Sequence, residues 1–316
     1  MFFLPPSLWE LVGAFLMNRD VPHLLQAWPS VWRERPRLPL VWNGKVDCPP
    51  TAPCPVQRLE FSGLPQHAWG RWGSYKVRIH TLCTATMPHL VHLDVSNTLI
   101  KSLLPIKHCT QLQHIKCEYT PVYSLAGVEW CPALQSVHCA FTNVCNLRPL
   151  RQSTELRHLD CRHTKVCSLL PLMHCPLLRV LCCDHTRVTS FAGLDKCTLL
   201  ESLSCRSWRP SVVQLLPLRA CARLSTLDVT IECPAADCTQ WPRTNVGCLR
   251  ACARLRALRL MGHRVSGVRS LARLQLQHAE MMVSADDMRW LRVCWPQVPQ
   301  VVVASGGVAL ASGPLP

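Results

Sequence analysis

Apolar residues recur through the middle of the chain at a fixed spacing of 22 residues, without an insertion or deletion. Each unit opens with a leucine, and the residues three and five positions further on are again apolar, most often leucine and cysteine. A threonine, a β-branched residue and two more apolar positions follow, so the unit reads L-x-x-L-x-C-x-x-T-x-V-x-x-L-x-x-L-x-x-C-x-x. The opening leucines are Leu90, Leu112, Leu134, Leu156, Leu178 and Leu200.

This unit predicts a short strand followed by a turn and a return segment. Alternate side chains of a strand point to opposite sides, so the fourth and sixth residues of each unit should face the core. The third, fifth and seventh residues should then face outward on the inner surface of a parallel sheet. One unit cannot bury its apolar side alone, whereas stacked units share a continuous core, so we predict a solenoid.

The spacing resembles the leucine-rich repeat in strict register over residues 90–206. The resemblance implies an α/β leucine-rich-repeat solenoid with a curved parallel sheet. That family usually carries asparagine where this chain has threonine, and the asparagine bonds to the backbone of neighbouring turns. Because a hydroxyl can donate one hydrogen bond and accept another, we expect the threonines to keep part of this ladder. They are Thr98, Thr120, Thr142, Thr164 and Thr186.

The repeat domain should extend over residues 56–304, with irregular units at 56–89 and 207–304. Two later units open at Leu224 and Leu255, and we expect the excess residues between Ile231 and Val246 to form a loop. A last helix is predicted from Asp286 to Trp295. The proline-rich residues 43–55 read as a linker, and the tail at 305–316, with small residues, glycine and proline, as disordered.

Residues 1–42 follow a different pattern. Ser7 to Glu10 form a capping box, and the apolar residues that follow share one helical face, which predicts a small bundle of short helices. The bundle carries more apolar surface than it can bury by itself. The spacing of Leu4-Pro5, Leu8, Val12, Leu16, Asp20-Val21 and Leu24 resembles an F-box.

The F-box resemblance implies that this segment docks on the Skp subunit of an SCF-type ubiquitin ligase and so joins a cullin. The implied contact residues are Leu4, Pro5, Leu8, Val12, Leu16, Val21 and Leu24. In the other interpretation, residues 1–42 are a helical cap that shields the first repeat from water.

The cysteines predict a reducing environment rather than disulfides. Most of the 21 cysteines fall into two core columns, so cysteine serves as a small apolar residue. Side chains stacked in register point in parallel, which strains any bridge between them. The first residues resemble neither a signal peptide nor a transit peptide, and no apolar run is long enough to span a membrane. We therefore expect a cytoplasmic or nuclear protein.

The formal charge is +15, which suggests a polyanionic partner. The basic residues are scattered, with no run of five and little aromatic interleaving, so we do not expect nucleic acid. No motif for phosphate binding, nucleophilic catalysis or paired-carboxylate chemistry is present, and the cysteine spacings fit zinc sites poorly. We predict no enzyme activity, no cofactor and no metal.

The outward positions of the repeats predict a binding surface. Several histidines share columns there, and they could hold a metal or an acidic ligand or simply be solvated. We interpret this concave face as mixed and mildly basic, and suited to a protein or peptide. Its candidate residues are His92, Asp94, His114, Lys116, Glu118, Tyr119, His138, Phe141, His158, Asp160, Arg162, Asp184 and Arg206.

The function predicted from these patterns is a non-catalytic substrate-recognition adaptor of an SCF-type ligase, with an unknown substrate protein held by the repeats. The alternative is a leucine-rich-repeat scaffold, unrelated to ubiquitin, that binds an acidic protein or a ribonucleoprotein.

Overall fold

The computed structural model describes residues 88–207, 214–231, 242–281, 283 and 285–294, together with four short strands outside these ranges. Two of these strands, β1 (Leu40–Val41) and β2 (Arg58–Glu60), begin the sheet. The other two, β14 (Ala304–Ser305) and β15 (Val308–Ala309), pair antiparallel. The predicted helices of residues 1–42, the linker at 43–55 and the rest of the tail at 305–316 lie outside the described residues.

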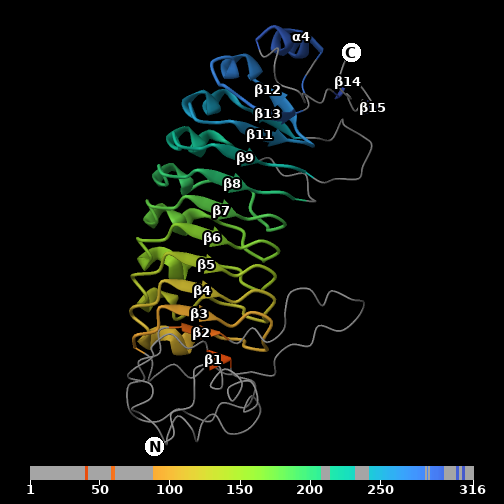
Figure 1. The fold of residues 1–316 in the computed structure, drawn as a ribbon. Coiled ribbons are helices and arrows are strands. Elements are labelled where there is room, and N and C mark those ends of the chain that lie inside the picture. Colours follow the sequence, from red (N-terminus) through yellow and green to blue (C-terminus); the bar gives the residue numbers. More distant parts are fainter. Residues whose placement is uncertain are drawn as a thin grey trace, which may run out of the picture.

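The chain forms a stack of coils with one 11-stranded parallel sheet along its length (Figure 1). Each strand pairs with the next one in sequence, apart from a short side sheet, as the solenoid prediction requires. After β2 the strands are β3 (His92–Asp94), β4 (His114–Lys116), β5 (Ser136–His138), β6 (His158–Asp160), β7 (Val180–Cys182), β8 (Ser202–Ser204), β9 (Thr226–Asp228), β11 (Ala257–Leu260) and β13 (His278–Met281).

Each coil returns through a short 3₁₀ helix on the side opposite the strands. Proline at the start of four of them presets the backbone for the first turn. In η2 and η5 the residue before the helix is Gly127 or Gly193 with positive φ, where a Cβ would lie 2.6 Å from a backbone oxygen of the preceding coil. The 3₁₀ helices are η1 (Leu104–His108), η2 (Val128–Trp130), η3 (Arg148–Gln152), η4 (Leu170–His174), η5 (Leu194–Lys196), η6 (Leu216–Ala220), η8 (Gly247–Ala251) and η9 (Val268–Leu271).

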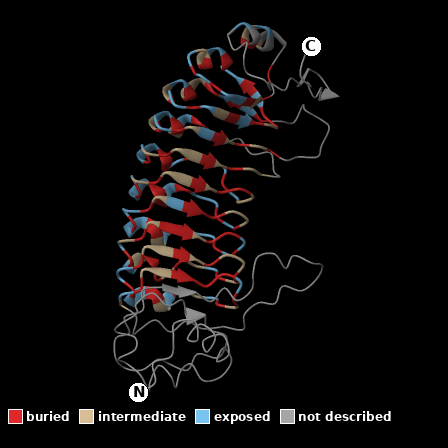
Figure 2. Cartoon of the chain, viewed as in Figure 1, coloured by how far each residue is buried: buried red, intermediate tan, exposed pale blue. Residues whose placement is uncertain are grey.

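The predicted core columns are buried in every described coil, and Figure 2 shows them as recurring stripes. The register of the strands explains why. Leu93 pairs with Ile115, and Ile115 with Val137, so equivalent side chains of successive coils touch along the axis. The helix α4 (Ala285–Cys294) contacts η9 at the C-terminal end and buries Leu291 against the core. This helix lies within one residue of its predicted bounds.

Part of the predicted loop between Ile231 and Val246 is a strand. β10 (Arg243–Asn245) pairs in parallel with β12 (Arg264–Ser266) in a separate two-stranded sheet. Thr244 points inward and is buried, whereas its two neighbours are exposed. A strand of three residues offers too short an alternation to be recognised in the sequence.

The threonine ladder does not form as predicted. Each threonine hydroxyl donates to the backbone carbonyl three residues earlier in its own coil, at 2.6 to 2.7 Å, as Thr142 does to Cys139. Threonine is shorter than asparagine by one atom, so the hydroxyl finds its acceptor within the coil. Backbone amides join the coils instead, for example from Cys117 to the carbonyl of His138 at 2.8 Å.

On the other side of the coil, cysteine thiols contribute a second set of links between coils. Cys175, Cys197 and Cys252 each donate to a carbonyl of the preceding coil, with Sγ to oxygen distances of 3.4 to 3.5 Å. Burial raises the pKa of these three thiols to about 12. The cysteines that the structure describes are free, and the two predicted columns are buried.

Among the described helices, none combines the length and the apolar character that a bilayer-spanning helix needs.

Ser153 occupies the position at which neighbouring coils carry the buried cysteines Cys131 and Cys175, and this generates a stability prediction. Its side chain is fully buried and its hydroxyl has no hydrogen-bond partner. A Ser153→Cys variant should replace a buried unpaired hydroxyl with a thiol that fills the site like its neighbours. We expect urea unfolding to show a gain of roughly 1 kcal/mol, since an unsatisfied buried polar group costs about 1 to 3 kcal/mol. A variant less stable than the wild type would contradict this interpretation; Thr154→Val in the exposed turn is the control.

His263 generates a prediction about pH. Its ring is fully buried beside Thr244, whose Oγ1 lies 2.9 Å from Nδ1, and burial lowers its pKa to about 4. Below pH 6.5 the unfolded chain takes up a proton that the folded chain does not bind until about pH 4. Stability is therefore kept above pH 6.5 and lost between these values, by roughly 3 kcal/mol in total.

Unfolding titrations of wild type and His263→Asn between pH 7.5 and 4.5 test this prediction. The asparagine keeps a polar group near Thr244 but does not titrate, so its stability should fall less steeply over this range. Equal slopes for the two proteins would show that His263 does not set the dependence.

Candidate functional site

The strand face is the surface made by the third, fifth, seventh and eighth residues of each unit, on and just after the strands β3 to β13. It corresponds to the predicted concave face. The candidate residues of that face all lie on it, because the register of the sheet holds equivalent positions side by side. Two groups of residues on this surface interact across coils: a row of aromatic rings and a chain of ion pairs.

The aromatic row consists of Tyr119, Phe141, His163 and His185, the eighth residues of four successive coils. Their rings stack in sequence, with centroids 4.4, 4.2 and 4.4 Å apart and interplanar angles of 10 to 28°. Phe141 keeps 39% of its surface exposed, and the other three rings are partly buried. Because the ring faces cover one another, the row presents mainly ring edges at its outer side.

The backbone of the aromatic row is unusual. All four residues have positive φ, between 52 and 56°, and their amides still donate to the next coil. The fold imposes this conformation, since Asn97 and Gly262 adopt it at the same position of other coils. Asparagine and glycine accept positive φ most easily, and histidine is also enriched there, whereas tyrosine and phenylalanine rarely adopt it.

Stacking alone does not account for aromatic rings at these positions. The left-handed conformation costs about 1 to 2 kcal/mol for an ordinary residue, or roughly 2 to 4 kcal/mol for Tyr119 and Phe141 together. Three stacked pairs return about 0.5 to 1.5 kcal/mol each beyond their burial. The two contributions are of similar size, so the rings bring the fold little net stability over asparagine or glycine, and their presence points to a use on the surface.

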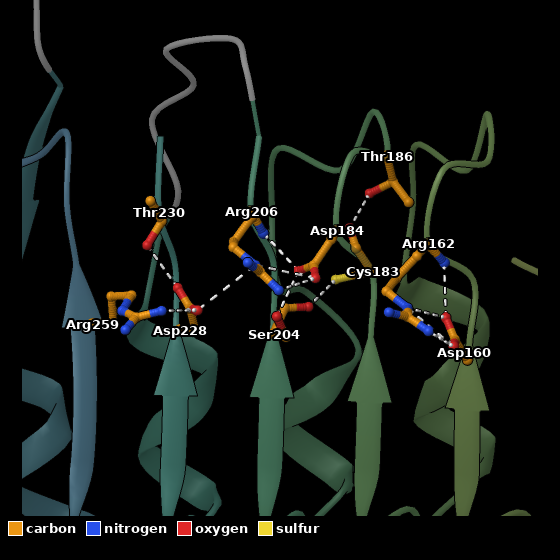
Figure 3. Close-up of polar contacts among 10 residues, drawn as sticks. All are labelled: Asp160, Arg162, Cys183, Asp184, Thr186, Ser204, Arg206, Asp228, Thr230 and Arg259. Atoms are coloured by element: carbon orange, nitrogen blue, oxygen red, sulfur yellow. Dashed lines mark hydrogen bonds and ion pairs between the residues drawn. The ribbon is translucent and has the colours of Figure 1, made fainter. Parts of the chain in front are cut away.

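The ion-pair chain crosses the C-terminal part of the strand face (Figure 3). Asp184 accepts bonds from the amide of Arg206 at 2.9 Å and from the Ser204 hydroxyl at 2.5 Å. The guanidinium of Arg206 also lies 3.7 Å from Asp228. Charges of alternating sign thus stand next to one another along neighbouring coils.

Arg259 continues the chain at its C-terminal end. It contacts Asp228 at 3.6 Å and donates twice to Glu280, at 2.7 and 2.9 Å. The pKa of Asp228 is raised because burial penalises its charge, although Thr230 and the two arginines oppose that effect. The alternation fixes these side chains and leaves a mixed, half-exposed polar surface.

Glu118, His138 and Asp160 form the group with the best geometry for a metal. One ligand atom of each lies within 4.8 Å of the others. Arg162, however, donates to both oxygens of Asp160 at 2.6 to 3.0 Å, and a cation would have to displace it. Burial raises the pKa of Glu118 and lowers that of His138, which weakens their ion pair at 4.0 Å. We assign no metal to this group.

The predicted mildly basic character of this face depends on its histidines. Burial is the largest of the causes that lower the pKa of His114, His138 and His163, which disfavours their charged form. Apart from the histidines, the described strand face has more acidic than basic side chains. The basic ones are Lys116, Arg162, Arg206 and Arg259, and the acidic ones Asp94, Glu118, Asp160, Asp184, Asp228 and Glu280. Most of the positive charge of the chain therefore lies elsewhere.

The sequence places His163 and His185 at position eight of the inner face, and the structure brings them together in the aromatic row. The structure also places residues on the strand face that the sequence did not assign to it. Asp228, Arg259 and Glu280 belong to the ion-pair chain. They were missed because the units lengthen after residue 206 and because the unit that opens at Leu276 was not recognised.

The residues predicted to bind a Skp subunit lie outside the described residues. They are Leu4, Pro5, Leu8, Val12, Leu16, Val21 and Leu24.

Comparison with known proteins identifies the fold. Neither a family model nor a curated protein matches the sequence. The crystal structure of an internalin (inlF) from Listeria monocytogenes aligns with a TM-score of 0.53 and 17% identity, over 72% of this chain and 70% of the internalin. Internalin C2 of the same species gives a TM-score of 0.51 and 19% identity, over 60% and 78%. At such identities the likeness concerns the fold alone, and that fold is a leucine-rich-repeat solenoid.

Proposed function

We propose that this chain is a non-catalytic protein-interaction module that binds a partner protein on its strand face. The aromatic row carries the proposal, because four rings occupy backbone positions that the fold would fill at lower cost with asparagine or glycine. Aromatic residues and arginine are enriched at the centres of protein interfaces, where they bury a large area with few rotatable bonds.

The neighbouring ion pairs support a protein partner rather than a polyanion. Arg162, Arg206 and Arg259 already face carboxylates of the same chain at 3.7 Å or less. An extended anion would meet acidic side chains on this surface. A protein with mixed charges can exchange one ion pair for another and cover the ring edges at the same time.

The finer part of the proposal is an adaptor role in an SCF-type ubiquitin ligase, in the cytoplasm or nucleus. It is supported by the spacing of Leu4-Pro5, Leu8, Val12 and Leu16, which resembles an F-box. Residues 1–42 would hold the Skp subunit, and the strand face would keep the substrate at high effective concentration near the ligase. No feature of the described residues favours the unrelated scaffold over this role.

The prediction that the strand face binds the partner protein is tested with a Tyr119→Asn, Phe141→Asn double variant. Asparagine fits the left-handed backbone, as Asn97 does, so the variant should fold while losing the stacked rings. We call the co-purified proteins other than the Skp subunit and the cullin the substrate-class partners. When the tagged variant is purified from the cells that make it, quantitative mass spectrometry should find at least tenfold less of these partners than with wild type.

The matched control is Trp130→Gln, which removes an exposed ring from η2 on the opposite side of the coil. It should leave the set of partners unchanged. If both variants lose the same partners, or neither loses any, the strand face is not the binding surface.

The prediction that residues 1–42 hold the Skp subunit is tested with a Leu8→Asp, Leu16→Asp double variant. Wild type should bring down the Skp subunit and a cullin, and the charged variant should not, because apolar docking residues would be replaced. Substrate-class partners should remain bound to this variant. If neither wild type nor the variant brings down the Skp subunit while other partners are still recovered, the ligase role is wrong and residues 1–42 act only as a cap.

A further inference from the structure

A second surface lies on the return side of the C-terminal coils, away from the strand face. The sequence Leu-Arg-Ala-Cys-Ala-Arg-Leu occurs twice without change, at residues 218–224 and 249–255. Each copy covers the end of a 3₁₀ helix, η6 or η8, and the turn that leads into the next strand. The two copies therefore present four exposed arginines, namely Arg219, Arg223, Arg250 and Arg254.

The two copies are stacked in register. The strands that follow them pair with Leu227 opposite Leu258, an offset of 31 residues that also separates the arginines. The thiol of Cys252 in the second copy donates to the carbonyl of Leu218 in the first, at 3.4 Å. The helices η6 and η8 contact each other, so Arg219 stands beside Arg250 and Arg223 beside Arg254. We call this two-by-two arrangement the arginine grid.

An acidic residue stands next to the arginine grid in the stack: Asp195 of η5 occupies the position in the preceding coil that corresponds to Arg219. In the part of the chain that the structure describes, none of its four side chains takes part in a hydrogen bond or an ion pair. Every arginine of the strand face, in contrast, has an acidic partner within 3.7 Å. Within each copy, the residues between the two arginines are two alanines and a buried cysteine, which are all small.

The fold does not require cations at these positions. The residues that correspond to Arg223 and Arg254 in four earlier coils include Gln111, Ala133, Glu155 and Leu177. Placing four like charges together opposes folding slightly, and neighbouring neutral residues would avoid this. The arginines are thus better explained by a ligand than by the solenoid.

The hydrogen-bonding groups of the four arginines indicate which class of ligand the grid can bind. A guanidinium group donates two parallel hydrogen bonds to a phosphate or carboxylate, and a compact set of arginines fits one phosphoryl group with its three oxygens. The grid contains no aromatic ring on which a nucleic-acid base could stack. We propose that the arginine grid binds a phosphorylated serine or threonine in a segment of a partner protein.

The experiment uses the full chain and a fluorescent peptide library with one central phosphoserine or phosphothreonine, beside the same library without phosphate. We expect phosphorylated peptides to bind at least tenfold more tightly in fluorescence anisotropy. An Arg219→Gln, Arg250→Gln double variant should lose at least tenfold of that affinity. An Arg223→Lys, Arg254→Lys variant should also bind more weakly, because lysine keeps the charge but not the paired donors.

The matched control is Arg148→Gln, Arg151→Gln, which removes two exposed arginines from η3 with the same change of net charge. It should stay within twofold of wild type. Equal binding of the unphosphorylated library, no binding of either library, or the same loss in the control would each overturn the proposal. Tighter, grid-dependent binding of a single-stranded RNA oligonucleotide would overturn it in favour of a nucleic-acid site.

Discussion

The hydrogen bonds that join each coil to the next are the constraint on which the rest of this structure depends. They hold successive strands in one register, so a residue type repeated every 22 positions becomes a column of touching side chains. The core arises in this way, since leucine meets leucine along the whole axis. Polar positions are stacked in the same way, and like charges placed side by side repel each other. Such a column is therefore stable when its charges alternate, when its rings stack, or when an external partner binds it.

The three described surfaces resolve this constraint in different ways. The ion-pair chain from Asp184 to Glu280 alternates its signs, and the aromatic row stacks its rings. In both arrangements the interacting side chains belong to this chain, and in the aromatic row the backbone cost roughly offsets the gain from stacking. The arginine grid repeats one sign over two coils, and its side chains form no ion pair with the described residues.

The columns were predictable from the sequence because a period needs only residue identities. Leu90 to Leu200 gave the strands, the core and most of the strand face. Local geometry was harder to predict: Thr142 bonds within its coil, and Phe141 adopts positive φ, for which Asn97 and Gly262 at the same position of other coils were the available signal. Where the units lengthen, the period no longer applies, so Asp228 and Arg259 were missed. The neutrality of His138 follows from burial, which sequence alone does not measure.

The positions of the two candidate surfaces bear on how the protein would work. The strand face and the arginine grid lie on opposite sides of the coils, so a partner on one leaves the other open. A single substrate with a phosphorylated segment could engage both if that segment passes around the edge of the solenoid. Once the strand face has bound the substrate, the contact between the phosphorylated segment and the grid would be intramolecular. Its contribution to the overall affinity would then depend on the length of the segment that connects the two sites. A phosphate on that segment would thus strengthen binding without altering the strand-face contacts. Under the two proposals, the grid would regulate binding and the strand face would recognise the partner.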